Sequence, residues 1–299
     1  MFDSAGKDGA RRPGTREMIA LLAGLMALNA FAIDAMIPAL SDIGADLSVA
    51  RENNRQLVVI AYMVGFGSTQ LVWGPLADRF GRKPVLLGGV TLYAAFALLC
   101  GIAASFTLLI AARALQGASA AVTRVLVVAM ARDLFEGEEM ARVMSLVFMV
   151  FMVVPVLAPS VGQLVLLAGS WRLIFLVLAA YGLAMLGWAW IRLPESLHPE
   201  YRRSLAPGAM AAAVWRTLSD RLSLGYTLAL TAAFGALMAY IASVQQIVAD
   251  AFGQGQWIGL VFAAVAARRW RSPPGRIHGS SGATDFDGWG MPGPSASRW

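Results

Sequence analysis

Charged residues are scarce in this sequence. Asp, Glu, Lys and Arg make up 14% of the 299 residues, whereas roughly a quarter of the residues of a soluble globular domain are charged. Hydrophobic residues make up 58%, and the mean hydropathy is +0.63. This composition excludes an ordinary soluble protein and predicts an all-α integral membrane protein, because long apolar segments cross a bilayer as helices.

Cysteine and histidine are almost absent. Cys100 is the single cysteine, which excludes a disulfide within the chain and a cysteine-based metal site. His198 and His278 lie outside the apolar segments, and no phosphate-binding glycine loop follows a predicted strand. We therefore expect no metal and no cofactor. The net charge of +6 comes from basic residues scattered between apolar runs, so we expect no nucleic-acid partner.

Long apolar runs dominate the chain. A helix needs about 20 mostly apolar residues to cross a bilayer, and the runs of that length are 17–40, 57–77, 84–104, 107–130, 143–167, 173–192 and 223–247. An eighth run begins near Trp257 and stops at Ala267. The first run also fits a secretory signal, but its apolar pattern continues to Leu40 and six more spans follow.

Basic residues alternate between the connections of these spans. One set of connections holds fourteen Lys and Arg residues, and the other holds only Arg51, Arg55 and Arg172. Positively charged connections stay on the cytoplasmic side of a membrane. We therefore expect a cytoplasmic N-terminus, residues 1–16.

The spans form two unequal groups. Residues 17–193 hold six closely connected spans, and the basic, proline-containing stretch 194–222 is expected to be a cytoplasmic linker. Residues 223–267 would begin a second bundle. Residues 268–299 are rich in Arg, Gly, Pro, Ser and Trp without a helical or strand period, and we expect an aberrant, disordered tail, for example from out-of-frame translation.

Three charged residues fall inside predicted spans, namely Asp34, Arg113 and Arg124. A charge near the centre of a bilayer costs roughly 3 to 10 kcal/mol, and function is the usual reason for carrying one. Asp34 and Arg113 are expected at matching depths in antiparallel spans. They are either a pair that exchanges with a proton or a cationic substrate, or a static ion pair that fixes helix register.

The span 107–130 carries Arg113, Gly117, Ala120 and Arg124 at steps of four, three and four, which places them on one helix face. Its small residues indicate either a cavity lined by two guanidinium groups or close helix packing. In the next span, Pro155 and Pro159 predict a kink. That kink is either passive or a working hinge.

The stretch GPLADRFGRK, residues 74–83, places a charged turn between the second and third spans. Its cations favour the predicted topology, which by itself requires neither the glycines nor the carboxylate. The stretch resembles the loop signature G-x-L-A-D-R-x-G-R-K-x-x-L of the major facilitator superfamily, specifically drug:proton antiporters of its twelve-helix branch. The matching positions are Gly74, Leu76, Ala77, Asp78, Arg79, Gly81, Arg82, Lys83 and Leu86.

Two further motifs are similar to those of the same family. Leu109-x-x-x-Arg113-x-x-Gln116-Gly117 looks like its fourth-helix motif. Pro155-x-x-Ala158-Pro159-x-x-Gly162 looks like its fifth-helix antiporter motif, although Ala158 and Gln163 stand where that motif commonly has glycine.

The first span and the end of the fourth resemble one group within that branch. The stretch from Asp34 to Pro38, together with Asp46, looks like the first helix of bicyclomycin-resistance-type exporters, and Arg124 and the run 132–134 are also similar to that group. The resemblance covers about residues 17–265.

The resemblance implies two six-helix bundles with a substrate site between them near the midplane. This chain would hold the complete N-terminal bundle and about one and a half helices of the C-terminal bundle, so it is apparently truncated after the seventh span. In the family, the glycine of the loop lets the second helix approach the other bundle. The aspartate, here Asp78, contacts the eleventh helix, and Arg82 would bond within the first bundle, for which Asp133 is the expected partner.

The predicted function is proton-coupled efflux of small drug-like compounds across the bacterial inner membrane, with the lipid bilayer, a small-molecule substrate and protons as partners. Asp34, Arg113, Gln116 and Arg124 would lie on the proton and substrate pathway. One alternative is an inactive or regulatory half-transporter that acts by association with other membrane proteins. A membrane enzyme is not supported, because no histidine, serine or second carboxylate converges on the buried charges.

Overall fold

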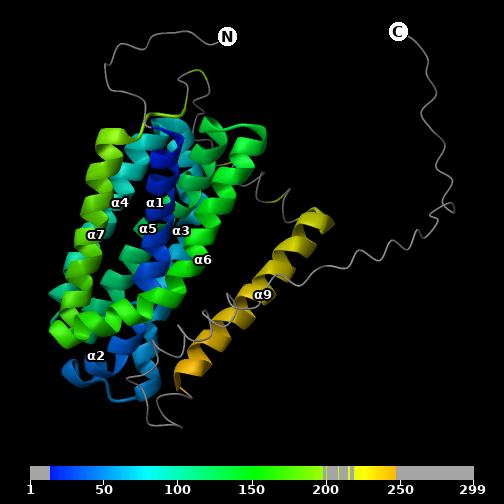
Figure 1. The fold of residues 1–299 in the computed structure, drawn as a ribbon. Helices are drawn as coiled ribbons and strands as arrows, with labels where there is room; N and C mark the ends of the chain where they lie inside the picture. The colour runs from blue at the N-terminus through cyan, green and yellow to red at the C-terminus, as the bar shows by residue number, and fades with distance from the viewer. Residues whose placement is uncertain (1–13, 198–199, 201–207, 209–214, 216–218, 247–299) are drawn as a thin grey trace, which may run out of the picture.

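The computed structural model describes residues 14–197, 200, 208, 215 and 219–246, and every regular element within them is helical (Figure 1). The long helices are α1 (Thr15–Asp34), α3 (Leu57–Phe80), α4 (Arg82–Gly101), α5 (Phe106–Leu134), α6 (Gly137–Ala168), α7 (Trp171–Arg192) and α9 (Arg221–Gln246). Three short elements, η1 (Ile37–Ala39), α2 (Leu40–Asp46) and η2 (Glu52–Gln56), connect α1 to α3. The expected all-α fold is confirmed.

The first predicted span is broken near its end. α1 stops at Asp34, and the chain continues as η1 and α2. Pro38, in the first turn of η1, cannot donate a backbone hydrogen bond to the preceding turn, so an uninterrupted helix through it would lose that bond. The polar residue Asp34 therefore lies at a helix end.

The two prolines of α6 have the expected effect. The segments Gly137–Pro155 and Leu157–Ala168 meet at an angle of 45°, because each proline removes a hydrogen bond from the helix and crowds the turn before it. Counting this bent pair as one span, up to six helices of the described residues are long and apolar enough to cross a membrane by length and composition, and five without it.

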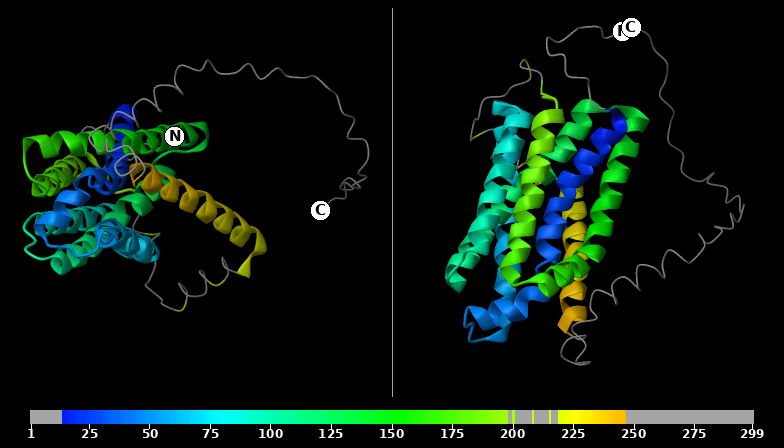
Figure 2. Two further views of the ribbon diagram at one scale, coloured as in Figure 1. Left: turned by 90° about the horizontal axis from the view of Figure 1, so that it is seen from below. Right: turned by 60° about the vertical axis from the view of Figure 1, so that its left-hand side comes forward.

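The helices from α1 to α7 pack side by side (Figures 1 and 2). α5 packs against α3 and α4, α7 packs against α4, and α1 contacts α5, α6 and α7. Buried apolar side chains form two clusters, and the first of them surrounds Asp34, Arg113 and Gln116.

The segment after residue 193 is described only in part. α9 covers nearly all of the predicted seventh span, and it begins with the Ser223 backbone N–H donating to Asp220 Oδ2 at 3.0 Å. It lies apart from the other helices in Figure 1. Most of the predicted linker, the remainder of the predicted second bundle and the predicted tail lie outside the described residues.

Glycine allows α3 and α5 to touch through their backbones. A Cβ atom added at Gly117 would collide with the Tyr62 carbonyl, and one added at Gly65 would collide with the Ala114 carbonyl. The side chains of Thr69 and Trp73 fasten the same two helices, because each donates to the Ala118 carbonyl oxygen at 2.8 Å. Small residues that admit close backbone approach are a usual basis of helix packing in membranes.

We expect Gly117→Ala to destabilise the protein by about 1–3 kcal/mol, because the added methyl group must push α3 away from α5. The matched control is Gly67→Ala, since a Cβ atom at Gly67 meets no atom within 4 Å. The apparent melting temperature in detergent, followed by tryptophan fluorescence, measures both. Equal melting temperatures for the two variants would contradict the close contact.

Candidate functional site

Five polar side chains are buried together between α1, α3 and α5. We call them the buried polar cluster, and its members are Asn29, Tyr62, Arg113, Gln116 and Thr123. Arg113, Gln116 and Thr123 lie on α5, Asn29 lies on α1, and Tyr62 lies on α3. Polar groups removed from water need hydrogen-bond partners within the protein.

Arg113 is completely buried. Its guanidinium donates to the carbonyl oxygens of Val58 at 3.1 Å and Ala32 at 3.2 Å, and to Gln116 Oε1 at 2.9 Å. The guanidinium carbon also lies 4.5 Å from the centroid of the Tyr62 ring. Carbonyl dipoles and an aromatic face therefore stabilise the charge in place of a carboxylate.

Asn29 connects the three helices of the cluster. Its amide donates to Thr123 Oγ1 at 2.6 Å and to the Ala120 carbonyl oxygen at 3.3 Å, and its side-chain oxygen accepts from the Tyr62 hydroxyl at 3.1 Å. Asn29 and Tyr62 were not predicted as site residues. The signal for Asn29 was that it is the single amide within the apolar run 17–40.

Only the oxygen of the Gln116 side-chain amide has hydrogen-bond partners among the described residues. Its side-chain oxygen accepts from Arg113 and from the Cys100 thiol, 3.8 Å away. Its side-chain nitrogen, Nε2, is buried and has no hydrogen-bond partner among the described residues. An unpaired donor of this kind in a protein interior is available to a group that arrives later.

Asp34 is buried, with 5% of its surface exposed. The pair predicted between Asp34 and Arg113 is not formed: the described part of the chain contains no ion pair or hydrogen bond of the Asp34 carboxylate. Three other acceptors already occupy the guanidinium of Arg113. Similar depth in the membrane does not place two side chains on facing sides of their helices.

α6 touches the chain directly beyond Asp34. A Cβ atom added at Gly162 would collide with the carbonyl of Ala35, so the glycine of the fifth-helix motif permits α6 to cross the break between α1 and η1. Pro159 lies almost one turn earlier, within the bent helix. The motif therefore bends α6 and brings it against the end of α1.

Between Arg113 and Arg124, the face of α5 is closely packed. Close packing was one of the two alternatives predicted for this face. Gly117 meets the backbone of Tyr62, and the Ala120 carbonyl accepts from Asn29. Arg124 is half-buried, and its guanidinium carbon lies 5.4 Å and 5.2 Å from the ring centroids of Phe148 and Phe151. Arg113 and Arg124 thus occupy separate surroundings.

The charged turn lies at the end of the bundle where α3 meets α4, which we call the motif end. Arg82 forms ion pairs with Asp78 at 2.7 Å and with Asp133 at 3.3 Å, so the expected contact with Asp133 is present. Gly81 has a φ of +103°, a conformation that side chains rarely adopt. The expected contact of Asp78 with an eleventh helix is not tested by the described residues.

Glu195 was not predicted as part of this site. Its carboxylate accepts from the backbone N–H groups of Arg82 at 2.9 Å and Lys83 at 3.3 Å, and thereby caps the first turn of α4. A side chain at Gly81 would press on it. Ser196 adds a hydrogen bond from its hydroxyl to Asp133 Oδ2 at 2.9 Å. The start of the predicted linker is thus fastened to the charged turn.

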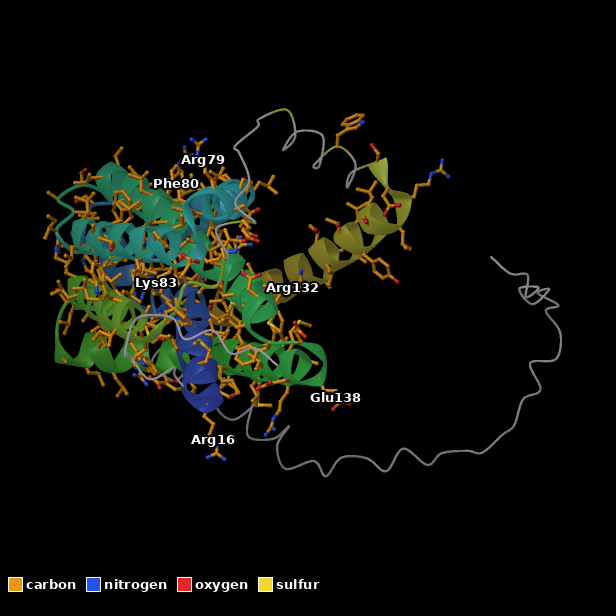
Figure 3. All side chains as sticks on the ribbon, turned by 90° about the horizontal axis from the view of Figure 1, so that it is seen from above. Arg16, Arg79, Phe80, Lys83, Arg132 and Glu138 are labelled. Atoms are coloured by element: carbon orange, nitrogen blue, oxygen red, sulfur yellow. The ribbon has the colours of Figure 1, made fainter. Side chains whose placement is uncertain are left out.

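The remaining residues of the loop motif have few contacts. Arg79 stacks on its neighbour Phe80, with 5.4 Å between the guanidinium carbon and the ring centroid. At Gly74, a Cβ atom would lie 3.9 Å from a methyl group of Val125 on α5. Figure 3 looks down on the motif end, with Arg79 and Lys83 labelled.

Two ion pairs hold α7 to the first span, one at each end of the bundle. Near the motif end, Arg192 binds both carboxylate oxygens of Glu17, at 2.5 and 2.6 Å. At the opposite end, Arg172 pairs with Asp46 at 2.5 Å, and the Trp171 indole donates to the same carboxylate oxygen at 3.1 Å. We call these pairs the end clamps.

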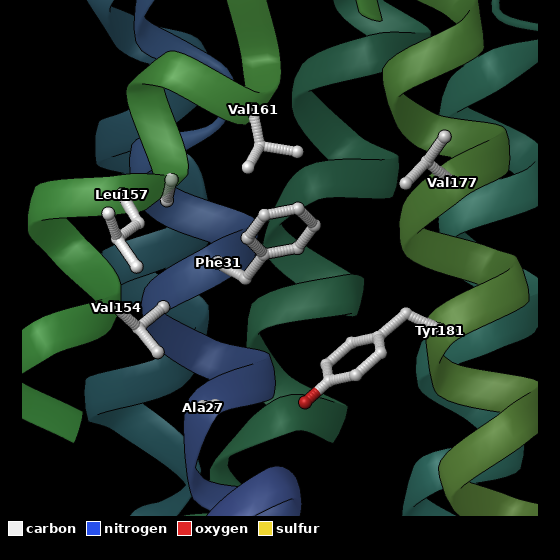
Figure 4. A pocket seen from close by; sticks show the side chains of 8 residues that line it. Ala27, Phe31, Val154, Leu157, Val161, Val177 and Tyr181 are labelled. Atoms are coloured by element: carbon white, nitrogen blue, oxygen red, sulfur yellow. The ribbon is translucent and has the colours of Figure 1, made fainter. Parts of the chain in front are cut away.

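A cavity of about 370 Å³ lies among α1, α6 and α7 (Figure 4). Its lining residues are Ala27, Phe31, Val154, Leu157, Ala158, Val161, Val177 and Tyr181. The one hydroxyl group of the lining, on Tyr181, donates to the Gly24 carbonyl oxygen at 2.8 Å. The cavity is therefore apolar and adjoins the bent part of α6.

Several long apolar helices and the polar groups buried between them define a polytopic helical membrane protein as the class of protein. The comparisons then give the family. Residues 19–268 match the family described as Major Facilitator Superfamily, and the chain belongs to this superfamily. The family consists of transporters rather than enzymes, which agrees with the prediction of no enzymatic activity.

The chain is similar to several bacterial proteins. It is 34% identical to the uncharacterized MFS-type transporter YdgK of Bacillus subtilis (80% of this chain, 60% of that protein) and 34% identical to the bicyclomycin resistance protein homolog of Haemophilus influenzae (73% and 54%). It is 36% identical to multidrug resistance protein D of Escherichia coli (56% and 42%). The chain therefore spans about half the length of these relatives.

Solved structures share the fold. The human transporter MFSD10 matches with a TM-score of 0.62 and 18% identity, over 87% of this chain and 72% of that chain. The inward-facing, unoccupied form of a bacterial Spinster homologue matches with a TM-score of 0.64 and 17% identity, over 87% of this chain and 62% of that chain. These likenesses confirm the fold class.

We expect Arg113→Lys to destabilise the protein by about 1–3 kcal/mol, because an ammonium group cannot replace the fork that reaches three acceptors on different helices. Asp34→Asn should leave the apparent melting temperature unchanged, because the Asp34 carboxylate has no partner to lose. Thermal unfolding of both variants in detergent checks this. A similar loss of stability in both would indicate that the two residues do form a pair.

Glu195→Ala should speed hydrogen exchange at the backbone amides of Arg82 and Lys83 and lower the melting temperature, because the first turn of α4 loses its cap. Glu200→Ala is the control, since Glu200 is exposed and lies in the same segment. Exchange followed by mass spectrometry on the peptide that contains both amides measures the effect. Unchanged protection in Glu195→Ala would rule out the cap.

Proposed function

We propose that this chain is the N-terminal bundle of a proton-coupled exporter of small drug-like compounds in a bacterial inner membrane. One observation carries the proposal: Asp34 is a buried carboxylate without a counter-ion, located where α1 breaks. An ionisable residue within a membrane span is rare and usually marks a proton or substrate pathway.

The lack of a partner suits Asp34 to proton exchange. A carboxylate held in an ion pair must first break that pair before it takes up a proton, whereas a free carboxylate does not. Arg113, which was expected to compete with the proton, is instead bound to carbonyl groups. In this proposal Asp34 carries the proton, and Arg113 and Gln116 hold α5 and the neighbouring backbone in place.

Protonation of Asp34 can affect the rest of the protein through α6. Gly162 of α6 rests on the backbone of Ala35, and the same helix bends by 45° at its prolines. Protonation would change the charge at the end of α1, directly beside this contact. We propose that α6 adjusts its bend in response, which makes the proline kink a working hinge rather than a passive feature.

The orientation and the substrate class are part of the proposal. Most cations of the described residues lie at the motif end, where Figure 3 shows Arg16, Arg79, Lys83 and Arg132, and this arrangement supports a cytoplasmic N-terminus. The names of two similar proteins, a bicyclomycin resistance protein homolog and a multidrug resistance protein, support efflux of drug-like compounds.

A second candidate is a half-transporter that acts by association with other membrane proteins. It is favoured by one observation, that the chain spans only 42% to 60% of the length of the three bacterial relatives. Alternating access in a major facilitator fold needs two bundles that rock against each other. In this candidate, a second copy or a different protein supplies the second bundle.

Because transport in this fold needs two bundles, we expect the protein, reconstituted in proteoliposomes at a density that lets two copies pair, to move ethidium against its gradient when a pH difference is applied. Asp34→Asn should abolish the response to pH. Asp42→Asn is the control, because Asp42 is exposed on the short helix α2. Ethidium fluorescence and an entrapped pH indicator report the two movements. If Asp34→Asn moves ethidium in response to pH at the rate of the unsubstituted protein, the proposed role of Asp34 is refuted. Co-purification of the chain with another membrane protein, without any transport of ethidium, would favour the half-transporter.

A further inference from the structure

Arg124 is a second cation on the helix that carries Arg113, in very different surroundings. It lies ten residues before the end of α5 at Leu134, which places it about 15 Å along the helix from the motif end. That depth is inside the hydrocarbon region of a spanning helix, where water does not satisfy a charged group.

The two arginines differ in what holds them. Arg113 donates hydrogen bonds to three acceptors, whereas Nη1 of Arg124 is buried and has no hydrogen-bond partner among the described residues. Arg124 also takes part in none of the ion pairs found in that part of the chain. A guanidinium group does not lose its proton in proteins. Its charge therefore persists, without an anion beside it.

Two aromatic rings lie beside this guanidinium. Phe148 and Phe151 of α6 have their ring centroids 5.4 and 5.2 Å from its central carbon. Ring faces attract a cation but provide no hydrogen-bond acceptor for its N–H groups. The result is a guanidinium group with an unpaired Nη1 beside an apolar wall, an arrangement suited to a ligand with an anionic head and an aromatic or aliphatic body.

We propose that Arg124, Phe148 and Phe151 bind a small organic anion, with the carboxylate or sulfonate accepting from the guanidinium and the apolar body against the two rings. This inference rests on the proposed export function and adds a second class of ligand to it, amphiphilic anions or zwitterions, beside the cationic ethidium of the transport test. Both phenylalanines precede Pro155, where α6 bends, so a ligand held between α5 and α6 contacts the segment of α6 on one side of the hinge.

The probe pair is 1-naphthoate and its neutral counterpart 1-naphthamide, measured by equilibrium dialysis against the purified full chain in nanodiscs of phosphatidylcholine. We expect the protein to bind 1-naphthoate about tenfold more tightly than 1-naphthamide, as a charge-assisted pair in an apolar site should. Arg124→Gln should remove this preference. The control Arg132→Gln, an exposed arginine on the same helix, should keep it.

Two further measurements keep the inference testable if Arg124→Gln does not fold. Arg124→Lys retains the charge but loses the two-pronged geometry, so its preference for 1-naphthoate should fall about threefold or more. Phe151→Leu should weaken both probes. Equal preference for 1-naphthoate in Arg124→Lys and the unsubstituted protein would overturn the site. Loss of 1-naphthoate binding when phosphatidylglycerol is added to the nanodiscs would assign the site to a lipid headgroup and overturn it as a substrate site.

The binding test and the transport test can fail independently of each other. Absence of pH-driven ethidium movement together with an Arg124-dependent preference for 1-naphthoate would refute the proposed export and leave an anion-binding site. Proton-driven transport together with a preference that Arg124 does not affect would refute the anion site and leave the exporter.

Discussion

The burial of one permanent charge governs how this bundle packs. The guanidinium of Arg113 cannot be neutralised and is completely enclosed, so it requires acceptors from its surroundings, and it finds them on the backbones of α1 and α3. The Val58 carbonyl lies on α3, and Gly65 and Gly117 allow α3 to approach α5 through its backbone. Asn29 and Tyr62 extend the same arrangement along the bundle. Apolar packing alone gives little direction in a lipid solvent, and this polar centre supplies it.

Features encoded by neighbouring residues were predictable from the sequence. Pro155 and Pro159 predicted the bend of α6, since a proline disrupts the helix that contains it. The contact between Arg82 and Asp133 was predictable from the loop motif. Glu195 was not, because its partners are backbone N–H groups more than a hundred residues earlier. The pairing of Asp34 with Arg113 was wrong for a related reason. Helical rise gives depth, but the direction in which a side chain points around its helix depends on the packing.

The two arginines within α5 show how similar sequence signals lead to different surroundings. Both lie on α5, and both would be costly in a bilayer without partners. Arg113 is satisfied by the fold, and Arg124 has rings beside it but no acceptor on Nη1. The number of satisfied donors therefore separates a cation that maintains the structure from one that is free to bind. The number of satisfied donors on each arginine cannot be read from the spacing of the residues along the chain.

The end clamps divide the bundle into parts with unequal freedom. Ion pairs at both ends of the bundle join α7 to α1 and to α2, and they restrain movement of α7 relative to these two helices. α6 has no comparable attachment: within the described residues, its one side-chain hydrogen bond to another helix joins Thr15 and Glu139 at 3.3 Å. Its packing against the first span is otherwise apolar or through glycine. A change in the bend of α6 would leave the end clamps intact, and the apolar cavity among α1, α6 and α7 would change volume as that helix moves.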